Sequence, residues 1–249
     1  MRYSISSLLV LATAGLVATT TAVQAQTLIG GGKSAPAFPI TISQPGSYKL
    51  AGSLVVPAGS SGIVINAANV TLDLDGHSIT GGNVCSGAYN VMTCSGSTSS
   101  VGVDVAAAAT IVSIRNGQIS GFGFGVRVGA GSAVADLRIN NISSVGLMAG
   151  AGSTVRDVNI VNVKVAGLSA SSSLVERVNI GYTPLAVLAL DSLIIGSMLT
   201  HVGTGIQDNS YGQAAQAPAL RESLVRADQQ AFLGTVRSLG NNSCNGLLC

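Results

Sequence analysis

The 249-residue sequence contains no tryptophan and few other aromatic residues, which make up 4% of the chain. A protein that binds sugars by ring stacking needs exposed Trp or Tyr side chains, so no broad stacking platform for glycans is expected. Charged residues are also scarce, at 9%, with 12 basic residues against 10 acidic ones. A chain so close to neutral lacks the excess of positive charge that attracts nucleic acid or anionic lipid. Neither is an expected partner.

Long apolar runs are missing too, apart from one near the N-terminus. There Arg2 precedes the apolar stretch Leu8–Val17, and small residues follow as far as Ala25. This order is typical of a secretory signal peptide. The stretch is shorter than the roughly 20 residues of a membrane anchor. We therefore expect residues 1–25 to be a signal peptide, no membrane span, and an extracytoplasmic protein, either periplasmic or secreted.

Cysteine and histidine are rare, with four and two residues. Cys85 with Cys94, and Cys244 with Cys249, form two short local pairs. In an exported chain such pairs favour disulfides over a metal site, although four cysteines permit three connectivities. Neither histidine stands at ligand spacing from a cysteine, and the glycine-rich turns do not precede a helix as phosphate loops do. No cofactor is expected.

The sequence is rich instead in a short repeat. The first segment of the repeat begins with a glycine and has apolar residues at its second and fourth positions. It occurs at Gly125–Val128, Gly146–Ala149 and Gly167–Ala170. The second segment of the repeat occurs at Val134–Ile139, Val155–Ile160 and Val175–Ile180. An earlier pair, Gly62–Ile65 and Gly102–Val105, is offset by about two repeat lengths. A fixed period of about 21 residues without helical spacing predicts a stacked solenoid.

Each repeat reads as a coil of short strands with corners. Val126 and Val128 flank Arg127, and because side chains alternate along a strand, the two valines should face the core and Arg127 the solvent. Equivalent positions of successive coils should then form rows about 4.8 Å apart. A bend is expected near Asp136.

The predicted organisation is a flexible leader at residues 26–38 and one β-helix domain at 39–249. Within it, residues 82–100 carry the first cysteine pair and read as a disulfide-stapled insertion that explains the doubled offset of the earlier pair. Residues 207–249 read as an irregular C-terminal cap. Residues 218–234 allow either a helix, since Pro218 suits a first helical turn, or one more irregular coil.

Several segments resemble a known group of proteins. Ile40–Leu50, followed by Gly62–Ile65 and Val70–Ile79, looks like the opening of exported bacterial right-handed parallel β-helix proteins of the pectate-lyase-like superfamily. Asn241–Cys249 resembles their disulfide-closed tail. The resemblance implies an all-β, single-stranded, right-handed parallel β-helix. It leaves function open, because that superfamily includes lyases, hydrolases, epimerases, phage tailspikes and proteins with no assigned activity.

The outward row of the first strand is the best candidate site, because superfamily enzymes usually place their cleft on one sheet face. It reads Val64, Asp104, Arg127, Met148 and Ser169. Asp104 and Arg127 should be adjacent, and they are the candidate catalytic residues. An arginine beside an acid can neutralise a uronate and abstract a proton, which is lyase chemistry. The same two residues can equally form an ion pair at the surface.

Other acidic residues offer further candidates. Asp136 and Asp157 share one row and are the candidate cation ligands, since calcium prefers oxygen; alternatively they satisfy backbone amides at the bend. Arg177 continues the row and suggests a charge ladder. Asp73 and Asp75 should share one face, and a carboxylate pair is the minimum for glycosidic acid/base chemistry.

The function that these features favour is a non-catalytic, exported β-helix protein whose partner is a polysaccharide or another extracytoplasmic polymer. The alternative is a polysaccharide-processing enzyme of the uronate lyase or epimerase type. A third possibility is a structural protein that assembles through its ends. The sequence does not distinguish a monomer from a homo-oligomer.

Overall fold

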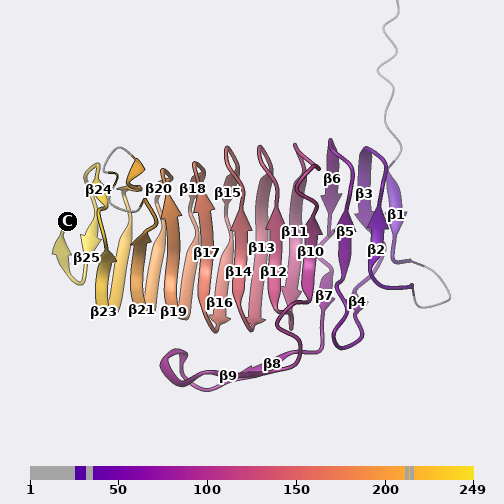
Figure 1. Ribbon diagram of the computed structural model, residues 1–249, viewed down its shortest axis with the longest axis horizontal. Helices are drawn as coiled ribbons and strands as arrows, with labels where there is room; N and C mark the ends of the chain where they lie inside the picture. The colour runs from indigo at the N-terminus through magenta and orange to yellow at the C-terminus, as the bar shows by residue number, and fades with distance from the viewer. Residues whose placement is uncertain (1–25, 32–35, 211–212, 214–215) are drawn as a thin grey trace, which may run out of the picture.

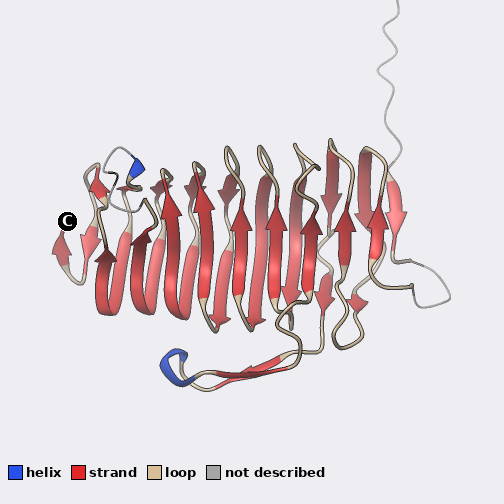
Figure 2. Ribbon diagram, in the orientation of Figure 1, coloured by secondary structure: helices blue, strands red, loops and turns tan. Residues whose placement is uncertain are grey.

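A computed structural model describes residues 26–31, 36–210, 213 and 216–249, which form a parallel β-solenoid of about 10 turns (Figure 1). The predicted signal peptide lies outside the described residues. The described residues form strands joined by turns, with short 3₁₀ segments and no α-helix (Figure 2). No helix in this part of the chain is long and apolar enough to cross a membrane. The predicted parallel β-helix is confirmed.

The strands line three faces, named here sheets 1, 2 and 3. Sheet 1 contains β2 (Ile40–Ile42), β5 (Ile63–Ile65), β10 (Val101–Val105), β12 (Phe124–Val128), β14 (Val145–Ala149) and β17 (Ala166–Ser171). Sheet 2 contains β1 (Thr27–Ile29), β3 (Gly46–Leu50), β6 (Val70–Asp73), β15 (Thr154–Arg156), β18 (Leu174–Glu176), β20 (Leu193–Ile195), β22 (Ala219–Arg221) and β24 (Arg237–Ser238). Sheet 3 contains β4 (Leu54–Val55), β7 (Ser78–Thr80), β16 (Asn159–Val163), β25 (Ser243–Cys244) and β26 (Leu247–Leu248).

The remaining long strands bend around a corner and serve two sheets. Sheets 2 and 3 share β11 (Ser113–Ser120) and β13 (Ala133–Ile142). Sheets 3 and 1 share β19 (Asn179–Leu190), β21 (Met198–Asp208) and β23 (Leu224–Leu233). Strand pairing reproduces the sequence period, because Val126 lies beside Leu147 and Leu147 beside Leu168.

The core runs along the axis of the solenoid as continuous apolar rows. Val134, Val155 and Val175 are fully buried, and Val105 and Val128 are 6% and 7% exposed. Val128 was predicted to face the core, and the equivalent positions of the other turns do so as well. Such rows bury apolar area in every turn, which is the main favourable contribution to folding.

A row of glycines explains the residue that opens each repeat. A Cβ atom added to Gly62, Gly102, Gly125 or Gly146 would lie less than 3.0 Å from the carbonyl oxygen of the glycine in the next turn. Real Cβ atoms do not approach so closely, so only glycine lets adjacent turns stack at strand spacing here.

A second row makes the corner between sheets 2 and 3. One residue per turn adopts the left-handed conformation, with φ between 50° and 63°, at Asn116, Asp136, Asp157, Arg177, Gly196 and Glu222. Asn, Asp and Gly tolerate this conformation best, which explains most of the row. The bend predicted near Asp136 is confirmed.

Residues 82–100 leave the stack as a hairpin, named here the arm. It consists of β8 (Val84–Ser86) and β9 (Thr93–Ser95), which pair antiparallel, with a 3₁₀ turn, η1 (Tyr89–Val91), at the tip. The Cys85–Cys94 disulfide joins the two strands, as predicted. Val103 of β10 lies directly beside Ile63 of β5, so the two strands belong to adjacent turns. The arm between them accounts for the doubled offset in the sequence.

The arm does not project freely, because it runs along the lower edge of the stack (Figure 1). At its base the buried Asn83 side chain donates a hydrogen bond to Ser143 Oγ at 3.1 Å. At its tip the Tyr89 hydroxyl donates to Asp228 Oδ2 at 2.5 Å. The arm therefore bridges turns that are far apart along the axis.

Both ends of the domain are more regular than the sequence indicated. The leader at 26–38 was expected to be flexible, but residues 27–29 form β1, which pairs with β3 and packs Ile29 against the core. Residues 219–233 are strands β22 and β23, so the helix alternative for 218–234 is wrong and the stack extends into the expected cap. The apolar residues there follow the coil pattern, with Leu220 and Val225 fully buried. The antiparallel pair β25–β26 and the Cys244–Cys249 disulfide end the chain.

Candidate functional site

The predicted outward row of sheet 1 forms as expected. Strand register places Val64 beside Asp104, Asp104 beside Arg127, Arg127 beside Met148, and Met148 beside Ser169. The row continues through Leu188 and Gln207. Alternation within each strand turns these side chains away from the core, so the row lies on the surface of the solenoid.

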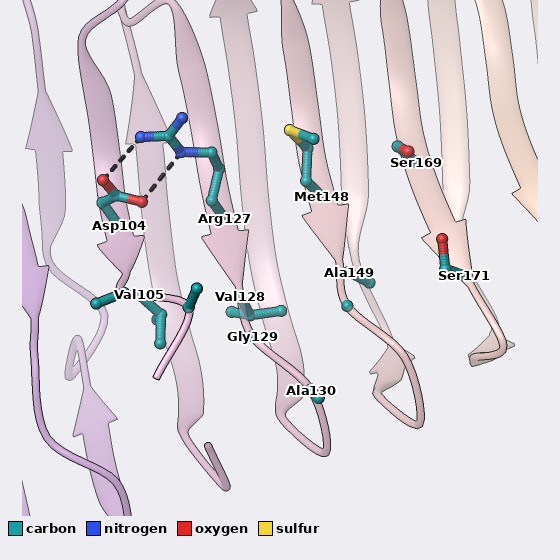
Figure 3. A pocket seen from close by; sticks show the side chains of 13 residues that line it. Asp104, Val105, Arg127, Val128, Gly129, Ala130, Met148, Ala149, Ser169 and Ser171 are labelled. Carbon is teal, nitrogen blue, oxygen red and sulfur yellow. Dashed lines mark hydrogen bonds and ion pairs between the residues drawn. The ribbon is translucent and has the colours of Figure 1, made fainter. Parts of the chain in front are cut away.

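Asp104 and Arg127 form a bidentate ion pair across one turn of the stack (Figure 3). Arg127 Nε donates to Asp104 Oδ1 at 3.0 Å, and Nη2 donates to Oδ2 at 2.7 Å. The guanidinium carbon also lies 5.2 Å from the centre of the Phe124 ring. The Arg127 and Asp104 side chains are 38% and 26% exposed, so solvent reaches both.

A shallow groove of about 610 Å³ opens beside this pair. One side carries the outward side chains of Asp104, Arg127, Met148 and Ser169 (Figure 3). The rest is lined by small residues where the strands end, among them Ala106, Ala107, Gly129, Ala130 and Gly150. Small side chains leave room there, so the groove crosses several turns of the stack without obstruction.

The chemistry that this groove allows is limited by the ion pair itself. Both carboxylate oxygens of Asp104 accept hydrogen bonds from Arg127. Asp104 is the one acidic side chain among the residues that line the groove, whereas glycoside hydrolysis by paired carboxylates needs two. The site therefore presents a neutralised polar pair beside an apolar floor, which suits binding better than proton transfer.

The candidate cation ligands Asp136 and Asp157 occupy the left-handed corner. Asp157 accepts hydrogen bonds from Arg177 Nε and Nη2, both at 2.8 Å. These hydrogen bonds from Arg177 lower the pKa of Asp157 below its ordinary value. The predicted charge ladder is present, because Arg177 pairs with the acid one turn away. Within the described ranges, no three His, Cys, Asp or Glu side chains cluster as metal ligands would.

Asp73 and Asp75 do not act as a free carboxylate pair. Asp73 accepts hydrogen bonds from Arg115 Nε at 3.0 Å and from Asn116 at 3.2 Å, and Asp75 pairs with Lys49 at 3.0 Å. Burial alone would raise the pKa of Asp73, but the Asp75 backbone amide, Arg115 and Asn116 together hold it below its ordinary value. A general acid needs a raised pKa, so the environment opposes that role.

Sequence reasoning missed the polar surface of sheet 3. Arg138 lies between Gln118 and Asn159 in one outward row. At the corner that ends this sheet, the Tyr182 and His201 rings stack with centroids 5.0 Å apart and planes 4° apart. Apolar and polar residues alternate from Leu137 to Asn140. This alternation, combined with the 21-residue period of the repeat, could have located the outward row that contains Arg138. No pattern in the sequence indicated the ring pair or the contact between the arm and Asp228.

Comparison with known proteins gives only distant similarities. No family model and no curated protein matches the sequence. The tailspike protein gp49 of Acinetobacter baumannii bacteriophage Fri1, a capsular polysaccharide depolymerase, is 10% identical over 77% of this chain, with a TM-score of 0.36. Tailspike protein 2 of Escherichia coli O157:H7 bacteriophage CAB120 is 10% identical over 84%, with a TM-score of 0.35.

This chain spans 57% of the length of the first tailspike and 43% of the second. The similarity is distant and concerns the solenoid. Fold does not determine function in such architectures, and at these identities and TM-scores neither tailspike's activity carries over. The candidate site must be judged on its own residues.

Proposed function

We propose that this is an exported β-helix protein that binds a polysaccharide, or a similar extracytoplasmic polymer, in the groove of sheet 1 without cleaving it. The observation that carries the proposal is the groove itself, whose one acid is bound at both oxygens by Arg127. The two disulfides support an oxidising, extracytoplasmic location.

The shape of the groove supports an extended ligand. Its outward residues come from successive turns, which lie about 4.8 Å apart, close to the length of one pyranose unit. Met148 offers an apolar surface to sugar C–H groups, and Ser169 and Ser171 offer hydroxyl groups. A chain lying along the axis would meet one outward side chain of the row at each turn.

The lyase or epimerase alternative rests on the same two residues. It requires Asp104 or Arg127 to act as a base on a uronate, but each is already engaged by the other. One observation keeps end-to-end assembly as a third candidate: Leu247 and Leu248, in the last strand, are 75% and 90% exposed. Exposed apolar side chains at the end of a stack favour association.

Incubation of the purified protein with a panel of uronate and neutral polysaccharides tests the proposal. Binding is measured by affinity electrophoresis, and cleavage by the ultraviolet absorbance of unsaturated products and by new reducing ends. We expect retention by one polymer and no cleavage. Ser169→Tyr, which fills the groove, should weaken retention, whereas Arg115→Gln on sheet 2 should not. Eliminative cleavage that disappears in Arg127→Gln would establish the enzyme instead.

A further inference from the structure

We propose a second ligand site on sheet 3: a polar trough that binds an extended chain of carboxylate-bearing sugars, with one sugar carboxylate on Arg138. The trough lies on a different face from the sheet 1 groove and does not depend on the function proposed for it.

The trough is made of two adjoining hollows. One, of about 480 Å³, is lined by Gln118, Arg138, Ile139, Asn140, Asn159 and Val161. The other, of about 300 Å³, is lined by Gly76, Asn116, Gly117, Gln118, Asp136 and Arg138. Both hollows are lined by Gln118 and Arg138, so they adjoin at these two side chains.

The fold arranges the polar groups of the trough in a straight row. Parallel pairing places Gln118 beside Arg138, Arg138 beside Asn159, and Asn159 beside Asn179. The inward neighbours Ile119, Ile139, Ile160 and Ile180 are fully buried, so alternation turns the polar residues outward. Successive polar side chains of the row are thus separated by one turn, about 4.8 Å.

These side chains are available to a ligand, unlike Asp104, Arg127 and Asp73. On sheet 1 Asp104 and Arg127 neutralise each other, and on sheet 2 Asp73 is bound by Arg115. Among the described residues, no ion pair and no side-chain hydrogen bond involves the row Gln118, Arg138, Asn159 and Asn179. Arg138 is exposed, so its guanidinium donors are directed to solvent.

The chemistry of the row selects the ligand. Amides both donate and accept hydrogen bonds, as sugar hydroxyls do, so a row of them matches a chain of sugars. A guanidinium binds a carboxylate through two parallel hydrogen bonds. Phosphate sites instead gather several cations or backbone amides, and Arg138 is the one cation lining the trough. An acidic sugar chain therefore fits better than a free phosphate ion.

Asp136 determines which side of Arg138 the carboxylate occupies. It lines the hollow toward the corner with sheet 2, whereas Asn140 and Asn159 line the other hollow. An acidic group placed beside Asp136 would meet like-charge repulsion. The carboxylate of the sugar therefore lies on the side of Asn140 and Asn159, and its ring hydroxyls lie toward Gln118.

Isothermal titration of the full-length, disulfide-bonded protein with hexagalacturonate and with neutral β-1,4-galactohexaose tests this site. Wild-type protein should prefer the acidic probe. Arg138→Gln should weaken hexagalacturonate binding by about tenfold or more and change neutral binding by less than about twofold. Arg156→Gln on sheet 2 is the matched control, because it removes an exposed arginine outside the trough, and it should change hexagalacturonate affinity by less than about twofold.

Asn159→Ala, checked for folding by circular dichroism, is a second variant and should weaken both probes. The inference is wrong if wild-type protein does not bind hexagalacturonate, or if Arg138→Gln and Arg156→Gln weaken binding equally. It is also wrong if only Ser169→Tyr removes binding, in which case the sheet 1 groove is the site. Loss of hexagalacturonate binding in Arg138→Gln, with Ser169→Tyr unaffected for every polymer, would support the trough and refute the function proposed for sheet 1.

Discussion

Replacing Gly146 by alanine tests whether the glycine row controls the stacking of turns. The new Cβ atom would lie 2.6 Å from the carbonyl oxygen of Gly167 and 2.7 Å from Ile160 Cγ2. Overpacking a core usually costs about 1–3 kcal/mol. Here one neighbour is backbone and cannot rotate away, so we expect the upper end of that range, about 3 kcal/mol.

Gly131→Ala is the matched control for this prediction. Gly131 has a left-handed φ of 65°, but a Cβ atom there would meet nothing within 4 Å. Its cost is conformational only, about 1–2 kcal/mol. Urea unfolding followed by far-ultraviolet circular dichroism should therefore give a lower midpoint for Gly146→Ala than for Gly131→Ala. Equal midpoints, or a lower one for Gly131→Ala, would refute the stacking argument.

The remaining predictions concern Asp73 and the arm. The lowered pKa of Asp73 means that its carboxylate stabilises the fold above about pH 4 and that this contribution is lost as the pH falls through the folded pKa. Asp73→Asn should therefore flatten the acid side of a plot of unfolding midpoint against pH, and a steeper acid side would contradict this. Replacing both Cys85 and Cys94 by serine removes about 2–3 kcal/mol of loop constraint, and it should speed proteolysis within the arm without lowering the unfolding midpoint of the stack. Tyr89→Phe should increase hydrogen exchange in the arm and leave exchange in β13 unchanged; unchanged exchange in both would show that the contact with Asp228 does not hold the arm.

The sheet 1 row was predictable because contacts in a solenoid are nearly all between neighbouring turns. Once the period of the repeat is known, alternation decides which side chains face outward, and the offset decides which of them are adjacent. Those two rules are enough to place Asp104 beside Arg127. The same rules predict buried rows such as Val134, Val155 and Val175.

Other features escaped prediction for identifiable physical reasons. Tyr89 and Asp228 are 139 residues apart, and no periodic relation connects an arm to the surface on which it docks. Strand β1 is only three residues long, and its glycine-rich surroundings resemble a leader. The row around Arg138 was overlooked because Asn and Gln are common in turns and carry no catalytic motif.

The docked arm also has a consequence for the order of events during synthesis. The ribosome makes the chain from the N-terminus, so the hairpin at residues 82–100 emerges long before Asp228, the residue that Tyr89 contacts. Turns of the stack can assemble one upon another as they appear, but the tip of the arm has no docking partner until β23 exists. The arm also carries Val84 and Val91, which are 66% and 68% exposed even in the finished fold. Both side chains are therefore exposed to solvent before the arm docks. Docking of the arm is therefore a late step, completed only after Asp228 has been made.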